Sequence, residues 1–483
     1  MGDGDAARWV TLGRLDARGA RIPAAHVAVP IAAALAAAVT GLAYWPGLMT
    51  WDPVRQYGEA LSGAITDWHP PVMQWVWQRL LPIAHGPAPM LVLQLGLFWA
   101  GLAILALGVR QDGRPRLGWA LLACGLWPPA MALMGAILKD CLMTGAILVA
   151  AGMLATQRER GRGWQRAAGL LFLLFAATLR FNAFAACLPL AVALLPAAWR
   201  CTVPRLALTS VAVAGILLAA MPLANRAIGA EPSAVELSLV IFDLGGITEH
   251  AGVNVFPDDI EVGDPVAVNH RCYRPAKWDS YSDWVDPECP LGFTAWSDNV
   301  DPAEVHPYLF WARAVLAHPI AYAEHRLTHF AINTRILPLT DAVERPVPHE
   351  DAPNPWGFRV APNPLLRSLD AAALATAHTP LGWPIVAIAL ALGALLAGAG
   401  LPNARLSVPI AASSALYGLG YLVLSVASEL RYHLWTQLGA LIAVVIVAGD
   451  IAGGATIARW RLGVGAGLIG SVIVLSTSLR LAA

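Results

Sequence analysis

The sequence predicts an all-α protein that crosses a membrane many times, and its composition is the first reason. Hydrophobic residues make up 57% of the 483-residue chain and charged residues only 13%, about half the charged fraction of an ordinary soluble domain. A lipid bilayer offers apolar surroundings for so many hydrophobic side chains. Basic and acidic residues number 32 each, so the chain has no basic excess with which to neutralise the phosphates of a nucleic acid.

Long uncharged runs are the second reason. A membrane-spanning helix needs about 20 apolar residues, and about eleven runs approach this length, at residues 24–44, 88–109, 118–138, 141–156, 167–179, 183–198, 206–226, 381–400, 406–427, 435–455 and 463–479. Two short runs, at 167–179 and 183–198, are interpreted as a hairpin with Arg180 at its tip, because a charge at mid-bilayer is costly. Counts of ten or twelve helices remain open.

The distribution of basic residues predicts the orientation. Arginines concentrate in residues 1–23 and in the segments 110–116, 158–166 and 200–205. All of these segments lie on the cytoplasmic side of the membrane if the N-terminus is cytoplasmic. The short segments of the other side carry few basic residues, namely Arg55, Arg79, Lys139, Arg180 and Arg431. The positive-inside rule therefore favours a cytoplasmic N-terminal tail at 1–23. The first apolar run lacks a clean cleavage site and is expected to be retained as a helix.

This orientation places two longer segments outside the membrane, the loop 45–87 and an insert at 227–379. The insert separates an N-terminal bundle (24–226, including the loop) from a C-terminal bundle (380–483). It carries 21 of the 32 acidic residues and many aromatic residues, in which disordered segments are poor. We therefore expect a folded extracytoplasmic insert that is mostly helical and rich in loops.

Cysteines support the same division of the chain. Four of the six lie in or beside predicted spans or in a cytoplasmic loop, and no CxxC metal-ligand spacing occurs. The remaining pair, Cys272 and Cys289, lies in the insert. Because the compartment outside the membrane is oxidising, these two residues are predicted to form a disulfide.

Polar residues in the loop 45–87 are the first candidates for a site. Asp52 directly precedes a proline, so its carboxylate either only caps the start of a helix or also faces a substrate. The same alternatives apply to Asp67 and His69, which stand ahead of two prolines. Trp68 is either a membrane anchor or a platform for a sugar ring. Two short helices lying at the membrane surface are expected in the loop.

Three helix tips on the sparsely basic side each carry one cation: Lys139, Arg180 and Arg431. Long basic side chains extend to lipid headgroups from such positions, which is one explanation. The other explanation is that the three cations converge. Cations that meet at headgroup level would hold a phosphate or a pyrophosphate.

The loop contains P-G-x-x-x-x-D-x-x-x-Q from Pro46 to Gln56, followed by D-W-H-P-P at 67–71. With these motifs the layout resembles the GT-C superfamily of integral membrane glycosyltransferases, which use polyprenyl-phosphate-linked sugars, and within it a group of bacterial proteins. The Lys139-Asp140 pair and the two other cationic tips also look like recurring elements of that group. The resemblance covers most of the membrane part and matches the insert only loosely.

The resemblance implies that Asp52 acts as general base or as metal ligand. It implies a lipid-phosphate leaving group, for which the three tip cations are suited. Substrate-binding roles are expected for Gln56, Asp67, Trp68, His69, Asn182 and Tyr432. Because Asp67 follows fifteen residues after Asp52 in place of a D-x-D pattern, no metal is assumed, and a divalent cation (Mg²⁺ or Mn²⁺) is left open.

The expected function is transfer of a sugar from a polyprenyl-phosphate donor to a glycan, lipid or protein acceptor. The reaction would invert the anomeric carbon, and the site would face outward from the bacterial cytoplasmic (inner) membrane. One alternative is a transporter or flippase of lipid-linked anions, although neither internal repeats nor charges at the centres of the spans are evident. Another is a non-catalytic scaffold of the cell envelope.

Overall fold

The computed structural model describes residues 24–157, 163–338 and 345–482. Helices account for about 70% of the structure, and the described residues contain no β-strand. They contain only two isolated bridges, Leu48–Ala136 and Thr66–Glu231. The predicted all-α class is therefore confirmed. The predicted cytoplasmic tail at 1–23 lies outside the described residues.

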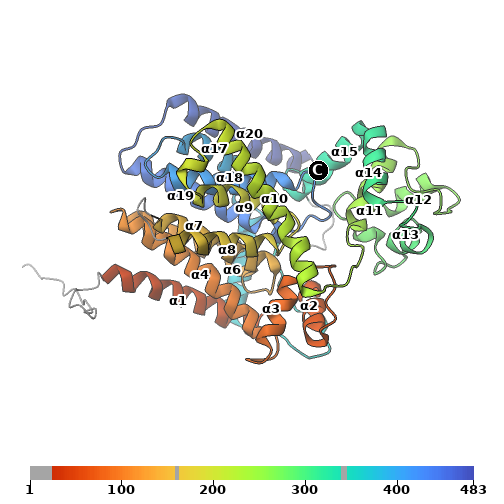
Figure 1. Cartoon of the computed structure of the whole chain (residues 1–483), viewed down its shortest axis with the longest axis horizontal. Helices are drawn as coiled ribbons and strands as arrows, with labels where there is room; N and C mark the ends of the chain where they lie inside the picture. Colours follow the sequence, from red (N-terminus) through yellow and green to blue (C-terminus); the bar gives the residue numbers. More distant parts are fainter. Residues whose placement is uncertain (1–23, 158–162, 339–344, 483) are drawn as a thin grey trace, which may run out of the picture.

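A bundle of helices forms the larger part of the molecule, with many axes running along its long direction (Figure 1). Its helices are α1 (Ala24–Tyr44), α4 (Ala88–Gln111), α5 (Pro115–Ala123), α6 (Pro128–Leu133), α7 (Lys139–Thr156), α8 (Gly163–Ala177), α9 (Ala183–Leu194), α10 (Val203–Ile228), α17 (Pro384–Gly398), α18 (Ala404–Gly420), α19 (Leu434–Ala452) and α20 (Arg459–Ala482). Two short helices, α2 (Trp51–Ser62) and α3 (Val72–Leu80), occupy the loop 45–87 as predicted.

Six helical segments of the described chain are long and apolar enough to cross a membrane: Val27–Tyr44, Ala88–Gln111, Lys139–Thr156, Val203–Ile228, Leu430–Ala452 and Arg459–Ala482. The helices α8, α9 and α17 are apolar but shorter. The chain is thus a multi-pass membrane protein. The single helix predicted at 118–138 is wrong, because Pro128 and Pro129 cannot donate backbone hydrogen bonds there. The structure instead has α5, a 3₁₀ turn at Cys124–Leu126 and α6.

Helices α4 and α7 pack very closely at the centre of the bundle. A methyl group on Gly101 would lie 2.6 Å from the backbone nitrogen of Val149, and one on Gly108 would lie 2.8 Å from Cβ of Ala155. Small residues permit such contacts between membrane helices. The packing buries 89% of the α7 segment and fixes the position of Lys139, its first residue.

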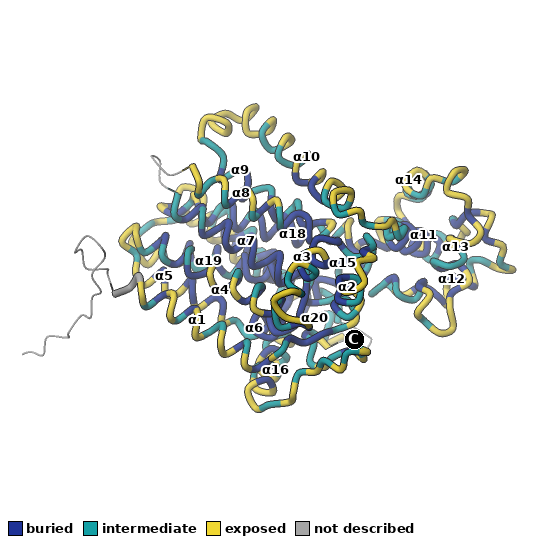
Figure 2. The backbone as a smooth tube through the Cα atoms, turned by 60° about the horizontal axis from the view of Figure 1, so that its bottom comes forward, coloured by how far each residue is buried: buried dark blue, intermediate teal, exposed yellow. Residues whose placement is uncertain are grey.

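A lobe stands apart from the bundle along the long axis (Figure 2) and has its own hydrophobic core. It comprises α11 (Leu237–Ala251), α12 (Pro265–Cys272), α13 (Phe293–Asn299), α14 (Pro307–Ala317) and α15 (Pro319–Asn333), with a 3₁₀ turn at Trp278–Tyr281. Cys272 and Cys289 are joined in it by a disulfide, with their Cα atoms 5.8 Å apart.

The segment expected as one insert, 227–379, divides between the two cores. After the lobe, the chain returns to the bundle: α16 (Pro364–Ala377) contributes Leu366 and Ala373 to the bundle core. Trp356 packs against Tyr57 of α2, with ring centroids 4.8 Å apart. Only the first part of 227–379 therefore forms the separate lobe.

Helix α15 connects the lobe to the bundle, since Ala321 belongs to the lobe core and Phe330 to the bundle core. A buried polar cluster attaches it to α11. Asp243 of α11 lies 3.1 Å from Nε2 of His325, forms an ion pair with Arg326 and accepts a hydrogen bond from Trp311 at 2.7 Å. Buried charges are stable only when they are paired in this way.

Close packing between α11 and α15 gives a test of this attachment. A methyl group on Gly246 would lie 2.1 Å from the ring of His325, whereas Gly263 has no neighbour within 4 Å of the same position. Gly246→Ala should lower the free energy of unfolding by about 1–3 kcal/mol through overpacking. Thermal unfolding of the purified protein in detergent measures the effect, with Gly263→Ala as control. Equal unfolding temperatures for the two variants would contradict this packing.

Candidate functional site

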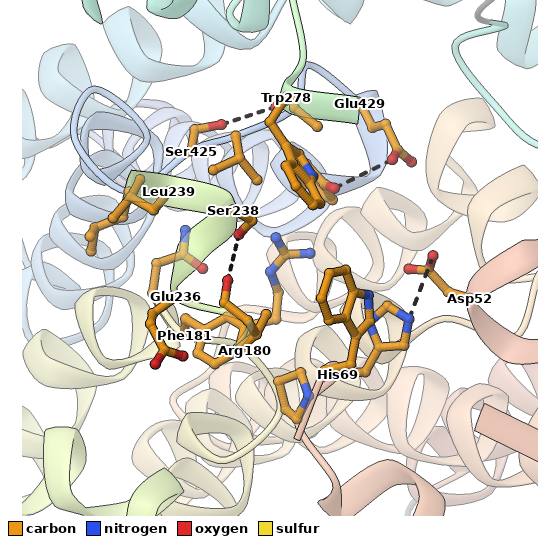
Figure 3. A pocket seen from close by; sticks show the side chains of 18 of the residues that line it. Asp52, His69, Arg180, Phe181, Glu236, Ser238, Leu239, Trp278, Ser425 and Glu429 are labelled. Atoms are coloured by element: carbon orange, nitrogen blue, oxygen red, sulfur yellow. Dashed lines mark hydrogen bonds and ion pairs between the residues drawn. The ribbon is translucent and has the colours of Figure 1, made fainter. Parts of the chain in front are cut away.

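A cavity of about 370 Å³ lies where the loop 45–87, the ends of bundle helices and the lobe meet. This junction cavity is within the usual size range of small-molecule sites. Its charged and aromatic lining consists of Asp52, Trp68, His69, Lys139, Arg180, Phe181, Glu236, Trp278, Asp279, Trp284, Tyr308, Tyr421, Glu429, Arg431 and Tyr432. In Figure 3, Arg180 and His69 lie across the cavity from Ser425, Trp278 and Glu429, and Asp52 lies at one edge.

Backbone pairing brings Asp52 to the cavity. The amide of Leu48 donates to the carbonyl of Gly135 at 3.1 Å, and the amide of Ile137 donates to the carbonyl of Leu48 at 2.9 Å. The start of the loop therefore runs beside the segment that precedes α7. As a result, Asp52 in the first turn of α2 lies next to Lys139 in the first turn of α7.

The capping explanation for Asp52 is wrong. Helix α2 begins at Trp51, two residues earlier than a cap at Asp52 requires, and Thr50 occupies the N-cap position. The Asp52 carboxylate instead binds two cations. Its Oδ2 lies 3.1 Å from Nζ of Lys139 and 2.9 Å from NH1 of Arg431. Residues far apart in the sequence thus meet at one carboxylate.

Each of the three tip cations is paired inside the protein. Arg431 also pairs with Glu429, and Arg180 pairs with the buried carboxylate of Asp140. The guanidinium of Arg180 lies 4.2 Å from the ring centroid of Tyr432, a favourable cation–π arrangement. Side-chain exposure is 11% for Lys139, 12% for Arg180 and 9% for Arg431. The three side chains therefore do not extend toward lipid headgroups in the structure.

The protonation states of Asp52 and His69 follow from their surroundings. Burial raises the pKa of the Asp52 carboxyl, but the positive charges of Arg431 and Lys139 outweigh this effect and hold it well below its usual value. Burial and the charge of Lys139 lower the pKa of His69 to about 3. His69 is therefore neutral at pH 7. Its Nδ1 lies 3.2 Å from the Lys139 ammonium, which only donates, so the imidazole proton resides on Nε2.

The cationic end of the cavity can still accept an anion. The buried Nε of Arg180 has no hydrogen-bond acceptor among the described residues. Helices α7 and α9 both begin at the cavity, at Lys139 and directly after Asn182. Because helix N-termini carry partial positive charge, they add to the attraction for a phosphate.

The structure brings together four of the six residues for which substrate binding was predicted: Trp68, His69, Asn182 and Tyr432 line the cavity. Gln56 and Asp67 do not. Gln56 lies one turn after Asp52 in α2 and is buried, with its amide in contact with that of Gln74 at 3.5 Å. Asp67 accepts hydrogen bonds from Ser233 and ties the loop to the segment that enters the lobe.

Sequence reasoning did not identify Glu429, Trp278 and Trp284 as site residues. Glu429 stands two positions before Arg431, and acidic residues beside a cationic tip are a signal for such a pair. The two tryptophans come from the lobe, and only the tertiary packing places them beside Trp68. The density of tryptophan in a segment predicted to lie outside the membrane was the available clue.

A divalent cation does not fit the residues present. Within the three described ranges, no group of three or more His, Cys, Asp and Glu side chains is placed to hold a metal ion. The Asp52 carboxylate, the expected ligand, is bound by Lys139 and Arg431. The cavity is thus organised around protein cations.

The chain matches no protein-family model and no curated protein sequence. The chemistry of the junction cavity and the loop motifs are therefore the basis on which its function is inferred. The cavity combines a carboxylate, three converging cations, a neutral imidazole and several aromatic rings.

The lowered pKa of His69 predicts how stability depends on pH. Between about pH 6.5 and pH 3 the unfolded chain binds a proton at this imidazole and the folded chain does not, so stability falls as pH falls. The contribution is at most about 1.4 kcal/mol per pH unit. His69→Gln should therefore show a smaller drop in unfolding temperature between pH 7 and pH 4.5 than the unchanged protein.

The control for this measurement is His270→Gln, because the His270 side chain is 77% exposed. This variant should retain the full pH dependence. An equal pH dependence for His69→Gln and the unchanged protein would contradict a neutral, buried His69.

Proposed function

We propose that the protein is a membrane glycosyltransferase of the GT-C type. It would move a sugar from a polyprenyl-phosphate donor to an acceptor on the extracytoplasmic face, with inversion at the anomeric carbon. The observation that carries the proposal is the convergence of Asp52 with Lys139, Arg180 and Arg431 in one cavity. A carboxylate that can take a proton and cations that can hold a departing phosphate are the two requirements of this reaction.

The three cations are suited to the donor phosphate. Hydrogen bonds between charged groups are short and strong, and Arg presents its donors in a fork that matches phosphate oxygens. A phosphate that enters the cavity competes with Asp52 and Glu429 for Lys139 and Arg431. Charge developing on the leaving phosphate would then be stabilised by cations already in position.

Apolar residues beside Arg180 support a donor that carries a lipid. Phe181, at the tip between the apolar helices α8 and α9, lines the cavity and is 52% exposed. Leu239 and Leu424 line the cavity as well, and Figure 3 shows Phe181 and Leu239 together on the side away from Asp52. A phosphate held by Arg180 would leave its prenyl chain next to these side chains and the surrounding lipid.

Asp52 is assigned the role of general base. The acceptor hydroxyl gives its proton to the Asp52 carboxylate while its oxygen bonds to the anomeric carbon. The bond between that carbon and the phosphate oxygen breaks, and polyprenyl phosphate leaves with the bonding electrons. Paired with two cations, Asp52 is a weak base. Donor phosphate draws these cations away, so its arrival raises the proton affinity of Asp52.

The location follows from the positive-inside pattern. Arg114 and Arg405 lie at the far end of the bundle, where they pair with Asp450 and Asp112. With this end in the cytoplasm, the junction cavity faces outward from a bacterial cytoplasmic membrane. The extracytoplasmic position of the lobe belongs to the same proposal, and so does a count of about eleven membrane crossings in which the run 118–138 crosses as the broken pair α5 and α6.

Replacement of Asp52 tests the base role. Asp52→Asn should lower sugar transfer by at least about 100-fold, the usual contribution of a positioned base. Binding of polyprenyl phosphate should be retained or tighter, because Lys139 and Arg431 lose a competing carboxylate. The assay incubates purified protein with a panel of polyprenyl-phosphate sugars and measures released polyprenyl phosphate.

Asp67→Asn is the matched control, since Asp67 is on the same loop, does not line the cavity, and accepts from Ser233 through Oδ1, an acceptor that asparagine keeps. It should transfer sugar at nearly the original rate. Transfer by Asp52→Asn at the original rate would remove Asp52 from the base role. Passage of the intact donor lipid across a bilayer, without release of polyprenyl phosphate, would support the transporter alternative.

Replacement of the cations tests donor binding. Lys139→Ala, Arg180→Ala and Arg431→Ala should each weaken polyprenyl-phosphate binding by about 10- to 100-fold, the effect of losing a hydrogen bond to a charged group. Binding is measured with protein in nanodiscs. Arg79→Ala is the control, because Arg79 is exposed and stacks on Trp75 outside the cavity. Unchanged affinity in all three variants would rule out a phosphate site.

A further inference from the structure

Three tryptophans form one wall of the junction cavity: Trp68 from the loop 45–87, and Trp278 and Trp284 from the lobe. Their ring centroids lie 6.0 Å apart for Trp68 and Trp278, 5.8 Å for Trp68 and Trp284, and 5.5 Å for Trp278 and Trp284. The wall exists only because the lobe packs against the loop. It therefore joins two segments that are about 200 residues apart in the sequence.

Two of these tryptophans, Trp68 and Trp278, are already in contact with other parts of the protein. The guanidinium of Arg55 lies 5.2 Å from the ring centroid of Trp68, so one face of that ring is covered. Trp278 is only 6% exposed, and its backbone amide donates to the carbonyl of Val426 at 2.8 Å. Trp278 is therefore buried, and Trp68 is only partly exposed. They support the third ring.

Trp284 differs from both, because 53% of its surface is open. Its neighbours Trp68 and Trp278 meet its ring at 83° and 89°, so neither lies flat on it. An aromatic ring held in a fixed orientation and open at a cavity wall is a stacking surface. Its electron-rich face attracts the polarised C–H groups that line one face of a pyranose ring.

Acidic residues in the cavity limit what can stack on Trp284. Asp279, next to Trp278 in the sequence, and Glu236, which Figure 3 shows beside Phe181, both line the cavity. Their carboxylates can accept hydrogen bonds from sugar hydroxyls, whereas they repel a second anionic group. The cations that would hold an anion surround Asp52. The acidic residues of the lining therefore favour a neutral polyol with an apolar face, rather than a second anion, as the partner of Trp284.

We propose that Trp284 stacks against a sugar ring of the acceptor, so that the acceptor is a neutral saccharide or presents one at its reacting end. This inference rests on the proposed glycosyltransferase function and adds the class of acceptor. Trp284 is a binding residue in this scheme, and Asp52 remains the base. The lobe then selects the acceptor, while the bundle holds the donor.

The test uses full-length protein in nanodiscs and a panel of neutral disaccharides: maltose, cellobiose, lactose and N,N′-diacetylchitobiose. Saturation-transfer NMR should detect binding of at least one of them. Trp284→Ala should weaken that binding at least 10-fold, and Trp284→Phe should retain most of it because a flat ring is kept. Trp199→Ala is the control, since Trp199 is 55% exposed and does not line the cavity.

Polyprenyl-phosphate binding is measured in parallel on the same samples. Retained polyprenyl-phosphate binding, with no disaccharide bound or with equal saccharide binding by Trp284→Ala, would overturn the acceptor inference and leave the donor site intact. Loss of polyprenyl-phosphate affinity in Trp284→Ala would also overturn it, because the ring would then serve the donor. Disaccharide binding without any polyprenyl-phosphate binding by the unchanged protein would instead overturn the proposed function.

Discussion

Ion pairing at the edge of an apolar bundle is the constraint on which the site depends. A charge in such surroundings is costly unless an opposite charge compensates it. Asp52, Lys139 and Arg431 come from three different parts of the chain, and the Asp52 carboxylate holds both cations. Arg180 and Asp140 form a second pair beside them. An anion that binds Lys139 or Arg431 exchanges partners with Asp52 or Glu429, which links occupancy of the site to the basicity of Asp52.

The loop that carries Asp52 is tied to the molecule at several points. Leu48 pairs with the segment before α7, and Met49 donates its amide to Asp351 at 2.7 Å and accepts one from Ala352 at the same distance. Asp67 holds the other end of the loop to Ser233. Precise positioning of a reacting group requires this kind of support from its neighbours. The carboxylate is thus presented by an anchored platform.

Composition and local pattern were sufficient for the all-α class, the two short helices of the loop, the turn at Arg180 and the disulfide, because each depends on residues close in sequence or on the surrounding solvent. The break at Pro128 was missed because the run is uniformly apolar. The motif suggested a substrate-binding role for Gln56, but Gln56 faces Gln74 inside the loop. The pairing of Arg180 with Asp140 and the tryptophan wall depend on tertiary contacts, which periodicity does not encode.

The order of the charges along the chain has a consequence for biogenesis. Synthesis from the N-terminus delivers Asp52, Lys139, Asp140 and Arg180 first, and these four balance one another. Glu429 and Arg431 follow some 250 residues later as a second neutral set. Neither half of the site therefore brings an uncompensated charge into lipid while the other is still being translated. The nascent protein can insert stepwise, and the junction cavity becomes complete only when its last helices arrive.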